Sequence, residues 1–265
     1  MPLLKQLFKK TNRDLLKRIG FTAFALAIFI IGTNIQVPGT DSITKNLGFL
    51  ELINTMGGGA LQNFSIFALG VMPYITATIV MQLLGELIPY FQELRKQGHT
   101  GRQKINMYSR YMGIAFAFIQ GYAFSFMFLG RSATASEYIY ISIVLTAGTA
   151  FLLWLGDRIT EKGIGNGLSL LIMAGILATL PSMFIDAFNG LVVLDGTLQE
   201  IAFGITKFIL FAIIYFAIII GVIFVQLAER KVPVQYANKS TAFTNGSASY
   251  VPIKVNTAGV VPVIF

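Results

Sequence analysis

Side chains that could do chemistry are few in this chain of 265 residues. The only histidine is His99, in a basic stretch, and there are no cysteines. An intramembrane serine protease needs a serine beside a histidine, and an aspartyl protease needs two aspartates at membrane depth. The apolar stretches of this sequence provide neither pair. We therefore expect no catalytic residue, no enzyme activity, no metal site and no cofactor.

The glycines at 163, 165 and 167 faintly resemble a phosphate-binding loop. No predicted strand precedes them, and the remaining spacing of such a loop is missing. Close packing of helices at a membrane surface explains these glycines better.

The composition predicts a membrane protein. Mean hydropathy is +0.70, 55% of residues are hydrophobic and 12% are charged, about half the charge of a soluble protein. A chain of this size cannot bury so much apolar surface by itself and needs lipid. The net charge of +8 indicates membrane topology and contact with anionic headgroups, with RNA as a second possible partner.

Six apolar runs are about as long as a membrane span, and none of them contains Asp, Glu, Lys or Arg. They cover residues 19–37, 64–84, 111–129, 138–155, 164–185 and 208–228. A seventh run begins near Thr257 and is too short to span a membrane before the sequence ends at Phe265. The fold class is therefore an all-α, polytopic membrane protein.

The basic residues predict the orientation of the spans. Of the 20 Lys and Arg, 17 lie in residues 1–18, 85–110, 156–163 and 229–256, and 3 lie in the alternate loops. Positive residues favour the cytoplasmic side. We expect a cytoplasmic N-terminus, with residues 85–110 and 229–256 in the cytoplasm.

Two features beside the second span are candidates for a functional role. Residues 46–56 are apolar along one helical face, are too short to span and precede three glycines, Gly57 to Gly59. They could form a re-entrant element or an amphipathic helix on the outer surface. Gly70 and Pro73 predict a bend in the second span, either facing a cavity or serving packing alone.

Residues 229–256 form a long, polar and basic connection. Two short extended stretches around Val232 and Val251 predict a protruding hairpin, with a solvated linker as the alternative. From the residues alone, a channel, a scaffold and an uncoupled transporter all remain possible.

Five stretches of the sequence form longer motifs. They are GGAL at 58–61 with FSIFALGVMPYITA at 64–77, GRQK at 101–104 with Tyr108, Arg110 and Tyr111, WLGDRITEKGIGNG at 154–167, Gln226 with RKVPVQYA at 230–237, and PIKVNTAGVVP at 252–262. These motifs resemble, in the same order and over nearly the whole chain, the SecY/Sec61 family of protein-conducting channels.

The resemblance implies a fold of ten helices in two halves around an hourglass pore. Residues 1–185 would be the first half, with helices one to five, and residues 186–265 the start of the second, with helix six and a truncated helix seven. The resemblance implies a pore ring of Val71, Ile75, Leu168 and Ile172. It also implies a plug at about 49–63, with Phe49, Leu50, Ile53, Met56, Gly57, Gly58 and Gly59 as its candidate residues.

The implied function is a passive channel in the cytoplasmic membrane that moves unfolded preproteins across it and membrane proteins into it. The implied partners are the small membrane subunits SecE and SecG, the motor ATPase SecA, the ribosome with its RNA and proteins, signal peptides, nascent chains and anionic lipids. Arg230, Lys231 and Lys239 would be a docking site for the ribosome or the motor. The alternatives are a polytopic solute transporter and a membrane scaffold or insertase without a pore.

Overall fold

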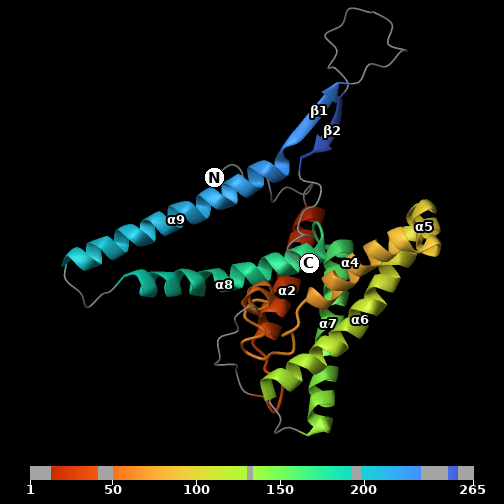
Figure 1. Cartoon of the computed structure of the whole chain (residues 1–265), viewed down its shortest axis with the longest axis horizontal. Helices are drawn as coiled ribbons and strands as arrows, with labels where there is room; N and C mark the ends of the chain where they lie inside the picture. Colours follow the sequence, from red (N-terminus) through yellow and green to blue (C-terminus); the bar gives the residue numbers. More distant parts are fainter. Residues whose placement is uncertain (1–12, 41–49, 130–133, 193–197, 234–249, 256–265) are drawn as a thin grey trace, which may run out of the picture. The chain divides into compact units, whose positions relative to one another are not determined.

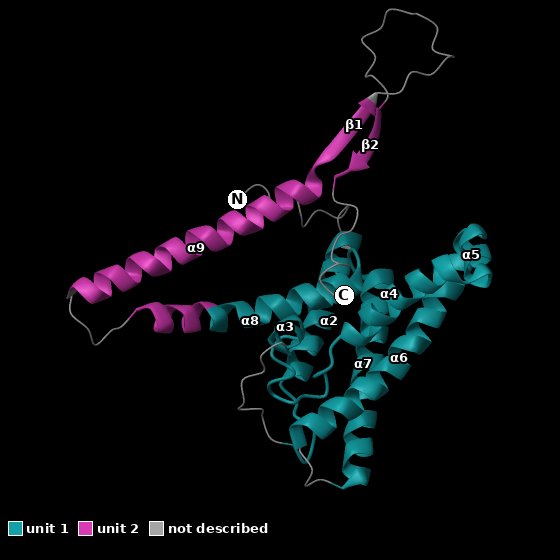
Figure 2. Cartoon of the chain, in the orientation of Figure 1, with its two compact units in different colours: residues 1–183 teal, residues 184–265 magenta. Residues whose placement is uncertain are grey.

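The computed structural model describes residues 13–40, 50–129, 134–192, 198–233 and 250–255. This part of the chain is mainly helical (Figure 1). Its elements are α2 (Arg13–Thr33), α3 (Glu51–Met56), α4 (Met72–Leu87), α5 (Pro89–Lys96), α6 (His99–Leu129), α7 (Ala135–Lys162), α8 (Gly167–Leu191), α9 (Leu198–Leu227), β1 (Glu229–Pro233) and β2 (Tyr250–Lys254). It divides into two compact units, residues 1–183 and 184–265 (Figure 2). That these units are the halves of a channel stays a prediction.

Five helices are long and apolar enough to cross a membrane: α2, α6, α7, α8 and α9. The pair α4 and α5 passes the same test only when taken together, and the two helices meet at a bend of 98°. The predicted all-α membrane architecture is confirmed. The described residues contain five candidate spans, or six if the bent pair counts as one.

The second predicted span, residues 64–84, is wrong at its start. The chain forms successive turns up to Val71, and the helix begins only at Met72. Pro73 therefore lies in the first turn of α4, where a proline removes no helical hydrogen bond. The predicted bend at Gly70 and Pro73 is replaced by a left-handed backbone at Gly70, with φ of 57°.

The sharp bend lies instead between α4 and α5. Ile88 connects the two helices with an extended backbone, at ψ 121°. The ring of Pro89 disfavours helical geometry in the residue before it, so α4 ends there and α5 starts in a new direction. The sequence analysis placed this segment in a loop.

Helices also fill most of two stretches that were expected to be cytoplasmic loops, residues 85–110 and 156–163. α6 begins at His99, twelve residues before the predicted third span at residue 111, and α7 continues to Lys162, past the predicted end at residue 155. Apolar runs mark only the part of a helix that fits in lipid. Lys, Arg, Gln and Glu are good helix formers, so the same helices continue beyond it.

The core of the first unit is a cluster of side chains that joins α2, α7 and α8 to the turns before α4. Phe67 lies at its centre, stacked between Phe29 of α2 and Phe151 of α7, with ring centroids 6.2 and 5.9 Å away. Gly32 in α2 leaves room for the Phe67 ring, because a Cβ atom there would overlap it. Residues 60–71 therefore pack against surrounding helices, although they are not helical themselves.

The second unit contains the end of α8, all of α9 and the strand pair. Phe184 and Phe188 of α8 pack edge-on against Phe208 of α9, with centroids 6.4 and 5.2 Å apart. β1 and β2 pair antiparallel, with Arg230 opposite Ile253. The two extended stretches of the predicted hairpin are thus confirmed. Its tip, including Lys239, lies outside the described residues, as does the predicted seventh run.

Candidate pore constriction and plug

The predicted plug contains a short helix, α3, which is held by a buried asparagine. The Asn54 side chain is 3% exposed. Its Oδ1 atom accepts a hydrogen bond from the Gln62 backbone N–H at 2.9 Å, and its backbone carbonyl accepts one from the Gly59 N–H at 2.9 Å. A helix of six residues is not stable alone. These bonds to the following turn therefore stabilise α3, and the sequence analysis did not single out Asn54.

The three glycines after α3 reverse the chain. Gly58 and Gly59 have φ angles of 72° and 80°, a region that glycine adopts without strain and other residues rarely do. The chain then reaches the end of α2, where the Val37 N–H donates to the Phe64 carbonyl and the Ile66 N–H donates to the Ile35 carbonyl, both at 3.0 Å. The glycine run thus turns the chain from α3 back towards the end of α2.

The predicted plug segment lies directly on the backbone of α8. A Cβ atom built on Gly175 would overlap the carbonyl oxygen of Met56 and would lie 3.0 Å from the Gly58 nitrogen. Only a glycine at this position of α8 lets the end of α3 come so close. Gly175 is a functional candidate that sequence reasoning missed, because nothing in the sequence shows which segment it faces.

Plug and predicted pore residues meet around a very small cavity of about 10 Å³. Its lining comes from the plug (Ile53, Met56, Gly57), from the turns and first helical residues after it (Leu69, Gly70, Val71, Met72, Ile75) and from α8 (Ile172). A water molecule needs roughly 10–15 Å³ and two or more polar partners. The lining side chains are all apolar, so a space of this size between the predicted plug and the predicted pore residues does not favour a water molecule.

Three of the four predicted pore residues, Val71, Ile75 and Ile172, therefore lie together beside the plug. Leu168 does not line the cavity. It lies one turn nearer the start of α8, where it packs on the core of the first unit, and a Cβ atom on Gly156 would come within 2.7 Å of it. Among the candidate plug residues, Leu50 packs on a second core cluster beside Ile53. Phe49 lies outside the described residues.

The glycine-rich connection between α7 and α8 is a packing element. A Cβ atom on Gly167 would overlap the carbonyl oxygen of Gly156, which confirms close helix packing there. The Asn166 Oδ1 atom accepts hydrogen bonds from the N–H groups of Leu168 and Ser169 in the first turn of α8, at 3.1 and 3.3 Å. The Thr22 hydroxyl of α2 also accepts one from the Ile164 N–H at 3.1 Å. Hydrogen bonds within the protein therefore hold both the loop and the start of α8.

Two of the three candidate docking residues lie on β1. Arg230 and Lys231 are exposed, and the Lys231 ammonium lies 4.8 Å from the centroid of the Tyr250 ring across the strand pair. This cation–π contact orients the lysine while leaving its charge accessible. Across the described residues, no group of three His, Cys, Asp or Glu side chains could hold a metal ion.

The sequence is similar to bacterial translocase subunits over nearly its whole length. It is 47% identical over 269 aligned residues to the protein translocase subunit SecY of Staphylococcus epidermidis, which covers 96% of this chain. It is 46% identical over 272 aligned residues to the corresponding subunit of Staphylococcus aureus, again covering 96% of the chain. The chain spans 62% of the length of these relatives.

Solved channel structures have a similar fold. A protein-conducting channel matches with a TM-score of 0.64 and 19% identity, covering 94% of this chain and 55% of that one. Sec61 in a canine ribosome–channel complex from the endoplasmic reticulum matches with a TM-score of 0.63, 19% identity and the same coverage. Residues 65–265 match the sequence profile of SecY, and the chain therefore belongs to the SecY family.

Proposed function

We propose that this chain forms part of a protein-conducting channel that moves unfolded preproteins across the cytoplasmic membrane and membrane proteins into it. The observation that carries the proposal is the fit of α3 against Val71, Ile75 and Ile172, which leaves about 10 Å³ between them. A plug on an aliphatic constriction closes a resting pore, and its movement opens one. We assign no catalytic activity to the chain.

The proposed seal works by exclusion of water. The six apolar runs contain no Asp, Glu, Lys or Arg, so a pore between them cannot select or reject ions by side-chain charge. A narrow aliphatic constriction gates by dewetting instead, and aliphatic side chains can move apart around a passing polypeptide. Leu168, one turn from Ile172 on the same face of α8, would extend this apolar wall along the pore.

The proposed orientation places the N-terminus and the β1–β2 hairpin in the cytoplasm, following the 17-to-3 distribution of Lys and Arg. The ribosome or the SecA motor would then dock on Arg230, Lys231 and Lys239. The small subunits SecE and SecG, signal peptides, nascent chains and anionic lipids complete the proposed partners. The ribosome is supported by the fold shared with Sec61 of a ribosome–channel complex.

The test is the resting ion conductance of the complete channel in planar bilayers. Ile75→Asn with Ile172→Asn, at two positions that line the cavity, should wet the constriction and raise the resting leak. The matched control is Leu83→Asn with Leu177→Asn, on the same two helices, where both side chains are about half exposed. This control should leave conductance unchanged at equal protein yield.

An equally tight channel in both double variants would remove these residues from the seal. A solute transporter or a scaffold without a pore predicts that result, together with loss of folding yield in proportion to the polar groups introduced. Deleting residues 50–56 should add to the leak without blocking protein export, which separates a plug from a structural support.

A further inference from the structure

The segment from α3 to the start of α4 contains two parts that differ in burial. In α3, only Asn54 is buried, and the Leu52 side chain is 47% exposed. From residue 60 onwards most side chains are buried, and those up to residue 69 are Ala60, Leu61, Phe64, Ser65, Phe67, Ala68 and Leu69. Segments with few buried apolar contacts open at a lower free energy than well-packed ones. The chain therefore holds α3 less firmly than the turns that follow it.

The change in burial falls at two glycines. Gly58 and Gly59 both have a left-handed backbone, with φ of 72° and 80°. Gly59 also faces open space, since a Cβ atom there would meet nothing within 4 Å. Glycine adopts positive and negative φ about equally readily. These two residues can therefore serve as a hinge between α3 and residue 60.

Phe64 fixes the chain on the far side of this hinge. Its φ of 45° is positive, unlike that of any other non-glycine residue that the structure describes. A bulky residue keeps such a backbone only where its surroundings hold it in place. The Phe64 side chain is 1% exposed, and its ring packs edge-on against Phe128 of α6, with centroids 5.9 Å apart.

Backbone bonds and core packing hold Phe64 from two further sides. Its N–H donates to the Leu61 carbonyl, and its carbonyl accepts a hydrogen bond from the Val37 N–H beyond the end of α2, both at 3.0 Å. Phe64 also belongs to a buried cluster with Ile141 and Leu145 of α7. Contacts with α6, α7 and the chain after α2 therefore compensate for the strained backbone.

We propose that α3 is a flap that swings on Gly58 and Gly59, while Phe64 anchors residues 60–71 in the first unit. The hydrogen bond between Asn54 and the Gln62 N–H crosses the hinge and breaks when the flap opens. The inference deepens the proposed channel function and rests on it for the role of the flap in gating. Only the part of the predicted plug before residue 60 would then leave the constriction.

The test is hydrogen exchange of the complete channel in detergent, measured by mass spectrometry. The N–H groups of residues 57–59 donate to carbonyls of α3, and those of residues 64–66 also donate to backbone carbonyls, so exchange on either side requires an opening of the structure. Residues 57–59 should exchange at least about tenfold faster than residues 64–66. Equal rates on the two sides would overturn the hinge.

Gly59→Ala tests the hinge itself. A methyl group fits at this position but disfavours the φ of 80°, so exchange at residues 57–59 should rise roughly fivefold or more, while residues 64–66 stay protected. The matched control is Gly39→Ala, which has a similar φ of 86° and equally open surroundings but lies outside the predicted plug. Equal exchange at residues 57–59 in the two variants would contradict the proposal.

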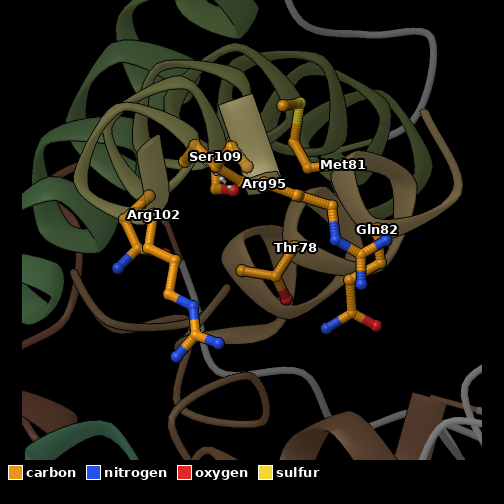
Figure 3. A pocket seen from close by; sticks show the side chains of 8 residues that line it. Thr78, Met81, Gln82, Arg95, Arg102 and Ser109 are labelled. Atoms are coloured by element: carbon orange, nitrogen blue, oxygen red, sulfur yellow. Dashed lines mark hydrogen bonds between the residues drawn. The ribbon is translucent and has the colours of Figure 1, made fainter. Parts of the chain in front are cut away.

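Phe64→Ala tests the anchor, and it should raise exchange at residues 64–66 to the level of residues 57–59. The matched control is Met81→Ala, which truncates another buried side chain of the first unit, at a separate cavity of about 420 Å³ between α4, α5 and α6 (Figure 3). If Phe64→Ala does not remain monodisperse, Phe128→Ala removes the ring partner and should raise the same rates. Unchanged exchange at residues 64–66 in the variant that is measured would count against the anchor.

Resting ion conductance separates this inference from the proposed function. Faster exchange in Gly59→Ala together with a raised leak supports both. Faster exchange with an unchanged leak supports the flap and contradicts its role in closing a pore. Uniform exchange across residues 51–71 overturns the flap, whatever the conductance.

Discussion

Gly175 of α8 lies against the carbonyl oxygen of Met56, the last residue of α3, so closely that a single Cβ atom would overlap it. This contact joins the predicted plug to the helix that carries Ile172. Both partners at the contact are backbone, since Gly175 also faces the Gly58 nitrogen. A methyl group at position 175 would therefore disturb the contact between α8 and the predicted plug.

Gly175→Ala should displace the plug and raise the resting ion leak of the complete channel. Overpacking of this kind costs about 1–3 kcal/mol, which exceeds the gain from a better helix former. The matched control is Gly190→Ala on the same helix, where a Cβ atom meets nothing within 4 Å. Planar-bilayer conductance checks the prediction, and an equal leak in the two variants would contradict it.

Asn54→Ala should loosen the plug from within. It removes the acceptor of the Gln62 N–H, and loss of one such buried bond costs about 1 kcal/mol. Thermal unfolding in detergent should start at a lower temperature, and the resting leak should rise. Gln62→Ala is the control, because its exposed side chain changes while its backbone N–H keeps the bond to Asn54. Equal unfolding temperatures and equal resting leaks in the two variants would show that Asn54 does not hold the predicted plug in place.

The orientation is open to a direct test, because the chain has no cysteine and each introduced one is unique. Cysteines at positions 96, 195 and 231 are each treated with a membrane-impermeant thiol reagent in intact cells. Asp195→Cys should be labelled, whereas Lys96→Cys and Lys231→Cys should be labelled only after the cells are opened. The reverse pattern would invert the topology.

Arg230→Glu with Lys231→Glu should sharply weaken ribosome binding by the complete channel. Contacts of Lys and Arg with RNA phosphates are steeply salt-dependent, so the loss should be largest at low salt and the salt slope should decrease by about 1 for each contact removed. The matched control is Lys96→Glu with Lys104→Glu, which makes the same charge change on the same predicted side of the membrane. Unaltered ribosome binding in the first variant would exclude RNA docking on β1, and a weakened SecA interaction would then indicate the motor as the partner.

The class of the protein and most of its elements could be predicted from hydropathy and local motifs. Lipid needs about 20 apolar residues per span, so apolar runs reveal membrane helices whatever their neighbours. The family could also be recognised from the sequence, because motifs such as those at residues 64–77 and 154–167 are continuous stretches of the chain. The paired stretches around Val232 and Val251 were visible for the same reason.

The conformation of the residues before α4 and the contacts of the predicted plug could not be predicted from the sequence, because they depend on tertiary packing. Residues 64–71 read as helix from hydropathy, yet they form turns because Phe67 packs between Phe29 and Phe151, far away in the sequence. Gly175 looks ordinary in the sequence for the same reason, since its contact with Met56 depends on segments that only folding brings near. Hydropathy reports the preference of each single residue for water or for lipid. A close contact or a cavity, by contrast, is formed by several segments that pack together.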